Sequence, residues 1–321
     1  MLKTIGVVTS GGDAPGMNAA IRGVTRVAHS KNFKVIGFEK GWEGLLTNTY
    51  GQLTPRSVSG ILDLGGTILQ TSRCPEFREK EAVKKAAETL ALNNVDGLVV
   101  IGGNGSLQGA LELSKETNTS IIGIPASIDN DIFGTAETIG FDTATNTAIT
   151  EIDKIRDTAA SLERIFMVEV MGRTRGFLAL TVGVTAGAEM ILIPEVKYEK
   201  EEIFRTVREM KERGKKSVII VAAEGIGDNR QLANEIENGT GAEVRLSVLG
   251  YTQRGGNPSA RSRLLACQFA EKAVELISER QKSKLVVLRN GETASMELEE
   301  SCKTEKTIDL RLLNLAKVLA T

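Results

Sequence analysis

The chain contains 321 residues, 40 of them basic and 41 acidic, and its pI is near 6.1. This length can bury a full hydrophobic core and corresponds to two domains of ordinary size or one large domain. The balanced charge argues against nucleic acid or an anionic membrane as the main partner, the apolar runs are too short to span a bilayer, and no secretory signal opens the sequence, so we expect a cytoplasmic protein.

The first half of the sequence passes repeatedly from an apolar run through a glycine-rich loop to an amphipathic segment, which is typical of an α/β fold. Strands are predicted at 4–9, 33–39, 97–101 and 121–124. Helices are predicted at 17–30, 57–64, 81–93 and after Ser106 through Lys115. The glycine-rich loops at 10–16 and 102–106 each follow a strand and precede a helix.

Two carboxylates, Asp129 and Asp131, follow the apolar run Ile121–Ile124. Such a run is typical of a strand buried in a parallel sheet, and parallel sheets bind ligands beyond the carboxyl ends of their strands. We therefore expect both carboxylates to face a ligand cleft, where one can accept a proton while the other holds a metal ion. The alternative is an Asp-Asn-Asp turn that only ends the strand.

The glycine loops expose backbone N–H groups at the start of a helix, where anions bind favourably, although the glycines can equally serve tight turns. Gly103, Gly105 and Ser106 could wrap a polyphosphate. The first loop is not a dinucleotide-binding fingerprint, and the chain contains no P-loop sequence, which excludes a P-loop kinase. The three loops should open into one cleft.

Two other features allow either binding or a purely structural role. Trp42, the only tryptophan, is predicted in a loop at a strand end, where it could pack in the core or stack on a base. Arg73 and Arg78 flank a proline-stiffened turn that could clamp phosphate oxygens or could be an ordinary solvated loop.

The strand and helix pattern restarts after residue 140. Strands are predicted at 165–170, 190–193, 217–222, 244–249 and 284–287. Helices are predicted at 143–162, 177–186, 200–213, 230–238, 259–280 and 310–319. No linker separates the halves, so the boundary near residue 140 is inferred from this restart alone.

The few histidines and cysteines narrow the possible chemistry. The three cysteines are widely spaced and include no Cys-x-x-Cys pair, so neither a disulfide framework nor a zinc cluster is supported. The single histidine, His29, is expected on the surface at the end of a helix, which makes a Ser-His-Asp triad improbable. A general base must then be a carboxylate, a lysine or a tyrosine.

Five motifs in order, Thr9–Asn18, Gly102–Ser106, Ser127–Asp131, Glu169–Arg173 and Leu249–Gly256, resemble those of bacterial ATP-dependent 6-phosphofructokinases over essentially the whole chain. The resemblance implies two Rossmann-like lobes with mostly parallel sheets, the phosphofructokinase fold, and a homotetramer whose subunits complete each other's sites. It assigns 1–140 with about 253–303 to nucleotide binding and 141–252 with about 304–321 to the sugar phosphate.

The resemblance also implies roles for individual residues. Asp129 matches the catalytic base, with Ser127 and Arg173 beside the transferred group. Asn104 and Asp131 match the Mg²⁺ site. The ATP site matches Gly12, Arg73, Cys74, Arg78, Gly103, Asn104, Gly105 and Ser106. The fructose 6-phosphate site matches Ser127, Ile128, Asp129, Arg164, Met171, Gly172, Arg173, Glu224, Arg245, Tyr251 and Arg254, of which Arg164 and Arg245 are supplied across a subunit interface.

The same resemblance implies which phosphoryl donor the chain uses and where an effector binds. Relatives that use pyrophosphate carry an aspartate and a lysine where this chain has Gly105 and Ala126, so ATP is the expected donor. The family's effector site, for ADP or phosphoenolpyruvate, matches Arg22, Arg26, Arg156, Gly187, Glu189, Arg213, Lys215 and Lys216. Pro55 stands where relatives often have arginine, which puts the effector response in doubt.

Three residues depart from the family pattern at the active site. Asn104 replaces an aspartate associated with magnesium, Tyr251 a histidine at the sugar phosphate, and Ser262 the aspartate of an Asp-Arg pair, whereas Ser127 for threonine keeps the hydroxyl. These departures leave two alternatives to an active kinase. One is a weakly active or inactive paralogue that regulates an active enzyme, and the other is a sensor of sugar phosphate or nucleotide.

Overall fold

Strands and helices alternate along most of the chain in the computed structural model, which describes residues 3–320. They form two units. Unit 1 runs through Thr143 and resumes at Arg254–Lys306, whereas unit 2 contains Ala144–Gln253 and continues from Thr307. The chain therefore passes from one unit to the other after Thr143, Gln253 and Lys306.

The sheet of unit 1 has the strand order β12-β11-β5-β4-β1-β2-β3, and β6 pairs with β5. Only the outer pairs, β2 with β3 and β11 with β12, are antiparallel. The inner strands are apolar and buried along nearly their whole length, as expected for a parallel sheet covered on both faces. The strands are β1 (Thr4–Ser10), β2 (Lys34–Phe38), β3 (Tyr50–Leu53), β4 (Val95–Gly102), β5 (Ser120–Ser127), β6 (Ile139–Gly140), β11 (Lys284–Arg289) and β12 (Glu292–Glu297).

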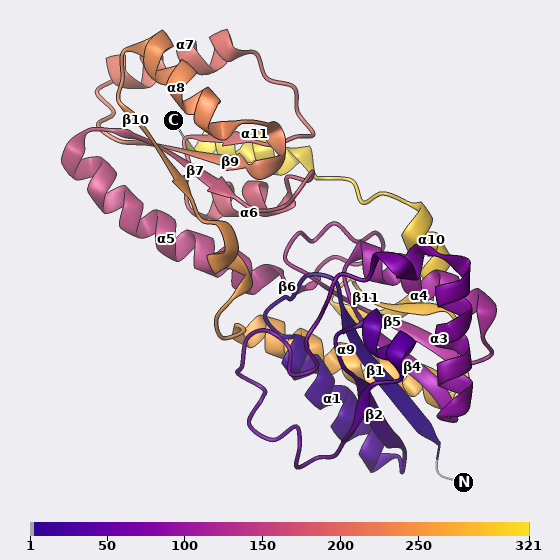
Figure 1. Cartoon of the computed structure of the whole chain (residues 1–321). Coiled ribbons are helices and arrows are strands. Elements are labelled where there is room, and N and C mark those ends of the chain that lie inside the picture. Colours follow the sequence, from indigo (N-terminus) through magenta and orange to yellow (C-terminus); the bar gives the residue numbers. More distant parts are fainter. Residues whose placement is uncertain (1–2, 321) are drawn as a thin grey trace. The chain divides into compact units, whose positions relative to one another are not determined.

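Helices cover both faces of this sheet (Figure 1). On one face α1 (Met17–Ser30) packs against α9 (Ala260–Ser278). The two helices approach so closely that a Cβ on Gly23 would lie 2.6 Å from the Cβ of Ala270. The other face carries α2 (Trp42–Thr47), α3 (Lys80–Leu92), α4 (Asn104–Glu116) and α10 (Leu298–Lys303).

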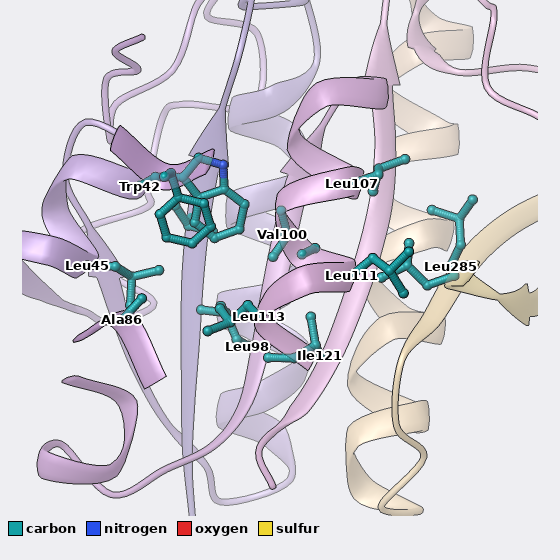
Figure 2. Close-up of a cluster of buried hydrophobic side chains, with 14 of the residues drawn as sticks. Trp42, Leu45, Ala86, Leu98, Val100, Leu107, Leu111, Leu113, Ile121 and Leu285 are labelled. Atoms are coloured by element: carbon teal, nitrogen blue, oxygen red, sulfur yellow. The ribbon is translucent and has the colours of Figure 1, made fainter. Parts of the chain in front are cut away.

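The core beneath α2, α3 and α4 is built mainly from aliphatic side chains and includes the stacked pair Trp42 and Phe77 (Figure 2). The Trp42 ring stacks on Phe77, with a centroid distance of 4.2 Å and an interplanar angle of 9°. Trp42 is only 5% exposed, and a Cβ on Gly109 would lie 3.2 Å from its ring. Trp42 therefore packs in the core, and the alternative that it stacks on a base is wrong.

Unit 2 has a smaller, wholly parallel sheet of order β10-β7-β9-β8. Its strands are β7 (Ile165–Val170), β8 (Met190–Leu192), β9 (Val218–Ala223) and β10 (Val244–Val248). One face buries a core against α7 (Lys200–Glu212) and α8 (Asn229–Thr240), and α6 (Phe177–Thr185) and α11 (Leu310–Leu319) pack together on the other. The long helix α5 (Phe141–Leu162) leads into this unit.

Most predicted strands and helices are confirmed to within a few residues, and His29 is exposed near the end of α1 as expected. The helix predicted at 57–64 is wrong. Thr54 and Ser57 hydrogen-bond to each other in a turn, and Gly60 adopts a φ of +76°, which ends any helical path. The short elements α2, β3, β6, β12 and α10 were not predicted. No helix within residues 3–320 is long and apolar enough to cross a bilayer.

Replacing Trp42 with alanine tests the core assignment. Because a stacked, buried ring is lost, we expect Trp42→Ala to lower the free energy of unfolding by about 3–5 kcal/mol, measured by urea denaturation followed by circular dichroism. Trp42→Phe, which keeps an aromatic ring against Phe77, should lose much less. Unchanged stability of Trp42→Ala, or weakened ATP binding by a well-folded Trp42→Phe, would contradict the assignment.

Candidate active site

Three loops follow neighbouring strands of unit 1 at one edge of its sheet. The parallel register aligns Ser10 of β1 with Gly102 of β4, and Gly102 with Pro125 of β5. Because parallel strands end at the same edge, the segments that follow β1, β4 and β5 leave the sheet side by side. The three loops therefore begin at one edge of the sheet, whereas the expectation that they open into one cleft stays a prediction.

The loop after β1 contains a glycine with positive φ and an ion pair. Gly11 has a φ of +82°, and its carbonyl accepts a 2.7 Å hydrogen bond from Thr71 Oγ1. Arg254 forms an ion pair with Asp13, and a Cβ on Gly12 would lie 2.7 Å from Nη2 of that arginine. Arg254, expected at the sugar phosphate, thus lies against Gly12, expected at ATP.

The loop after β4 leads directly into α4, which begins at Asn104. A Cβ on Gly102 would lie 2.6 Å from the carbonyl oxygen of Ser10, so close strand packing explains this glycine. Gly105 is different, because a Cβ there would meet no protein atom within 4 Å. The N–H of Ser106 donates to the Gly103 carbonyl at 3.0 Å, and the N-terminus of a helix generally favours an anion.

The loop after β5 brings Ser127, Asp129 and Asp131 together with Asn104. Asp129 is only 9% exposed, and its N–H donates a 3.1 Å hydrogen bond to Ser127 Oγ. Asp131 is half-buried, and its carbonyl oxygen lies 3.5 Å from Asn104 Nδ2. The side chain of Ile128 is buried.

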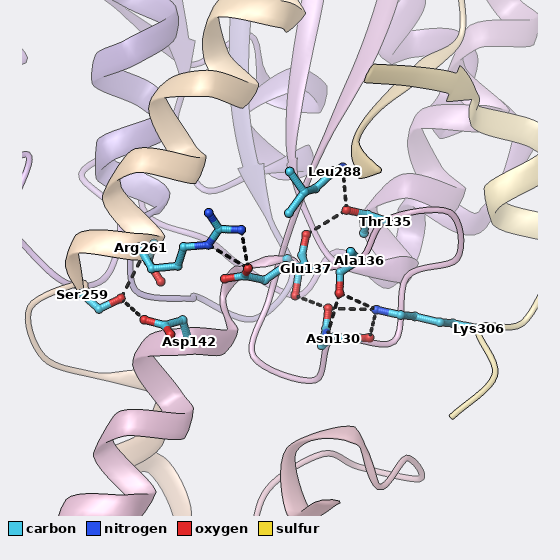
Figure 3. Close-up of polar contacts among 11 residues, drawn as sticks. Asn130, Thr135, Ala136, Glu137, Asp142, Ser259, Arg261, Leu288 and Lys306 are labelled. Atoms are coloured by element: carbon cyan, nitrogen blue, oxygen red, sulfur yellow. Dashed lines mark hydrogen bonds and ion pairs between the residues drawn. The ribbon is translucent and has the colours of Figure 1, made fainter. Parts of the chain in front are cut away.

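Hydrogen bonds within this loop, together with contacts from β11 and α9, hold it in place (Figure 3). Thr138 Oγ1 donates to the Ser127 carbonyl at 2.6 Å. Thr135 Oγ1 donates to the Glu137 carbonyl at 2.8 Å and accepts from the N–H of Leu288 at 3.0 Å. Arg261 of α9 forms an ion pair with Glu137 at 2.9 Å. The loop is therefore fixed at both ends and along its length.

The residues at this edge fit a magnesium ion that is held partly by phosphate oxygens. No cluster of three or more His, Cys, Asp or Glu side chains suited to a metal occurs within residues 3–320. Mg²⁺ is commonly held by one or two carboxylates with substrate phosphates and water, so such a cluster is not required. Asp131 offers a carboxylate, and Asn104, whose amide nitrogen contacts Asp131, offers its amide oxygen.

The segment with Arg73, Cys74 and Arg78 follows Thr71, which contacts the glycine loop. Pro75–Arg78 forms a 3₁₀ turn anchored in the core by Phe77, and both arginines are exposed. Cys74 Sγ donates to Glu76 Oε2 at 3.5 Å. Burial raises the pKa of the Cys74 thiol, and the hydrogen bond to Glu76 raises it further, so the thiol is neutral at pH 7.

In unit 2 the carboxylate of Glu224 organises the turn after β7. Its Oε1 accepts from the N–H of Gly172 at 3.2 Å and from the N–H of Arg173. Met171 N–H donates to Gln253 Oε1 at 3.3 Å. Gly172 and Arg173 both have positive φ, 139° and 53°, so the glutamate fixes a turn that few sequences adopt. Met171, Gly172, Arg173 and Glu224 are thus brought together.

Arg164 immediately precedes β7, and Arg245 lies in the neighbouring strand β10. Both arginines form ion pairs with Glu243. This glutamate therefore holds together two arginines expected to bind phosphate. Tyr251, on the short 3₁₀ helix Gly250–Arg254, is 77% exposed.

Two of the residues matched to the effector site, Arg156 and Lys215, meet at a third, Glu189. This carboxylate forms ion pairs with Arg156 at 3.6 Å and Lys215 at 3.2 Å. Arg156 also donates to the Gly187 carbonyl at 2.9 Å. Lys216 instead pairs with Glu163 at 2.9 Å, and Arg213 lies at the end of α7. Arg22 and Arg26 lie on α1 of unit 1.

Ser262 lies at the first turn of α9, where its N–H donates to Ser259 Oγ at 3.2 Å and its hydroxyl accepts from Thr143 Oγ1 at 2.8 Å. Ser262 is buried, and its N–H is capped by Ser259, the N-cap residue of α9. Asp13, Glu243 and Lys306 were not predicted from the sequence as partners of site residues. Glu243 carries the opposite charge and lies two residues before Arg245, which could have suggested it, whereas Lys306 lies 176 residues from its partner Asn130 and has no local signal.

The phosphofructokinase family model matches residues 4–277. A protein of Clostridium botulinum named ATP-dependent 6-phosphofructokinase is 46% identical over 319 residues, covering 99% of this chain and 100% of the relative. A second, from Clostridium novyi, carries the same name and the same identity over 319 residues.

Solved structures agree with these matches. The phosphofructokinase of Saccharomyces cerevisiae superposes with a TM-score of 0.86 at 34% identity, covering 99% of this chain but 46% of the yeast chain. A pyrophosphate-dependent phosphofructokinase from Marinobacter aquaeolei, only 22% identical, shares the fold with a TM-score of 0.86. Because the family model and the relatives extend over nearly the whole sequence, the chain belongs to the phosphofructokinase family.

Proposed function

We propose that the chain transfers the γ-phosphoryl group of ATP to the 1-hydroxyl of fructose 6-phosphate, forming fructose 1,6-bisphosphate and ADP in glycolysis. The observation that carries this proposal is Asp129, held at the end of β5 beside two intact glycine loops. The chain is also 46% identical to proteins named for this reaction.

The chemistry requires one proton acceptor and compensation of phosphate charge. The sugar oxygen forms a bond to the γ-phosphorus, the bond from that phosphorus to the β,γ-bridging oxygen breaks, and ADP leaves. Asp129 accepts the proton of the sugar hydroxyl. The single histidine, His29, is exposed near the end of α1, so we assign the role of general base to this carboxylate. We assign Ser127 and Arg173 to stabilising the transferred group.

We propose that unit 1 binds the nucleotide through Gly12, Arg73, Cys74, Arg78 and Gly103–Ser106, and that unit 2 supplies most of the sugar-phosphate residues. The open space at Gly105 supports ATP as the donor, because a side chain at this position would project into space that the protein leaves empty and that we assign to the nucleotide. Mg²⁺, held by Asp131 and Asn104, would offset charge on the phosphate oxygens when bound.

Assembly and regulation form a further part of the proposal. We infer a homotetramer located in the cytoplasm, as expected for a glycolytic enzyme of this family. Arg156, Lys215 and Glu189 support an effector site for ADP or phosphoenolpyruvate, because two cations converge on one carboxylate that an incoming anion could replace.

The direct test is to incubate the purified chain with ATP, Mg²⁺ and fructose 6-phosphate and to measure fructose 1,6-bisphosphate and ADP. We expect both products in equal amounts. Binding of either substrate without product would support a sensor. Absence of product, with activity appearing only when another phosphofructokinase is added, would support the regulatory paralogue.

Asp129→Asn keeps the shape of the side chain and removes the proton acceptor. We expect kcat to fall by about 10²–10⁴-fold, the usual contribution of a general base, with ATP affinity little changed. Asp96→Asn is a matched control, because Asp96 is an exposed carboxylate near the start of β4 that accepts from the N–H of Thr4. Wild-type turnover by Asp129→Asn would disprove the assignment.

Gly105→Asp tests donor selection without disturbing the protein. Since no protein atom lies within 4 Å of the added Cβ, the thermal midpoint should stay unchanged. We expect ATP use to be abolished, while pyrophosphate use need not appear because Ala126 still lacks the lysine charge. A folded Gly105→Asp variant with wild-type kinetics for ATP would refute this role.

Asn104→Asp tests whether the neutral amide limits magnesium binding. A carboxylate adds charge to the ligand set, so the variant should reach half-maximal rate at a lower Mg²⁺ concentration or have a higher kcat. Titration of initial rate against Mg²⁺ at saturating substrates provides the measurement. If neither quantity improves in a well-folded variant, Asn104 does not limit the enzyme.

A further inference from the structure

Lys306 is the last residue of unit 1, beyond the end of α10, and its side chain reaches the loop after β5 (Figure 3). Its Nζ donates to the Asn130 carbonyl at 2.8 Å, to Asn130 Oδ1 at 3.0 Å and to the Ala136 carbonyl at 3.3 Å. An ammonium group has three donors, and all three meet acceptors in this loop.

These contacts converge on the residue between the two site carboxylates. Asn130 has a φ of +51°, in the left-handed region that asparagine adopts more readily than most residues. Its Nδ2 donates to the Ala136 carbonyl at 3.3 Å, and its Oδ1 also accepts from Thr138 Oγ1 at 3.4 Å. Lys306 thus joins the start and end of the loop through Asn130 and Ala136.

The surroundings of Lys306 are costly for a cation. The side chain is half-buried, and burial lowers its pKa to about 8, while the charges of Asp131 and Glu137 act in the opposite direction. A partly desolvated ammonium is retained only where fixed acceptors and carboxylates compensate it. The backbone carbonyls of the loop after β5 provide that compensation.

We propose that Lys306 is a positioning residue for phosphoryl transfer, which by holding Asn130 fixes the directions in which Asp129 and Asp131 are presented. The inference rests on the proposed function of Asp129. Lys306 itself need not touch a substrate. A displacement of a reacting group by about 1 Å can cost 10²-fold in rate, so a small shift of this turn is sufficient for a large effect.

Lys306→Met removes the charge and the donors and keeps the aliphatic stem. We expect kcat to fall by about 10–10²-fold with the KM for ATP changed by less than about threefold, because the proton acceptor is misplaced while the glycine loops are intact. Lys306→Arg, which keeps charge and donors, should recover part of the loss. Lys303→Met is the matched control, since Lys303 lies three residues earlier in an exposed pair with Glu299.

Amide hydrogen exchange separates this proposal from the proposed function. Lys306→Met should speed exchange in residues 128–137 and leave the strands of unit 1 unchanged, and Lys303→Met should change neither. This readout needs no turnover. If the wild-type chain forms no fructose 1,6-bisphosphate, the proposed function fails, whereas the exchange rates still show whether Lys306 holds the loop.

The proposal is overturned if folded Lys306→Met keeps wild-type kcat and wild-type exchange in 128–137. It is also overturned if kcat, ATP affinity and stability fall together and Lys306→Arg restores none of them, since that describes a purely structural residue. If Lys306→Met does not fold, Lys306→Ala is prepared in propylammonium, with n-propanol as the neutral control. Recovery of kcat by the amine alone supports the proposal, and equal or no recovery contradicts it.

Discussion

The parallel pairing of β1, β4 and β5 is the constraint on which the site depends. Once Ser10, Gly102 and Pro125 are in register, the segments that follow must leave the sheet together. Glycine at 102 is required because the neighbouring carbonyl of Ser10 would lie 2.6 Å from any Cβ. The close approach of these parallel backbones therefore determines both how the strands pack and where the polar residues of the three loops lie.

Cationic residues expected to bind phosphate are already paired within their own unit. Arg254 contacts Asp13, Arg164 and Arg245 share Glu243, and Arg156 and Lys215 share Glu189. Such pairs orient a guanidinium before a ligand arrives, and a phosphate must then compete with a carboxylate for the same donors.

Local patterns predicted the parts of the fold that are determined locally. The run Ile121–Ile124 followed by two carboxylates indicated a buried strand ending at a site, and the glycine loops indicated helix starts. The partners of those residues were not predictable, because Lys306 and Asn130 meet through tertiary packing alone. Likewise, the helical pattern at 57–64 is overridden by a side-chain turn at Thr54 and by Gly60, and the burial of Trp42 depends on Phe77.

The strand order of unit 1 has a consequence for synthesis on the ribosome. β5 is translated early, but its neighbour β11 and the helix α9 that covers α1 come only after Ala144–Gln253 of unit 2. The sheet of unit 2, by contrast, is complete once Val248 has emerged. During translation the nascent chain thus carries an open strand edge and an uncovered apolar helix face, both of which attract chaperones and other nascent chains.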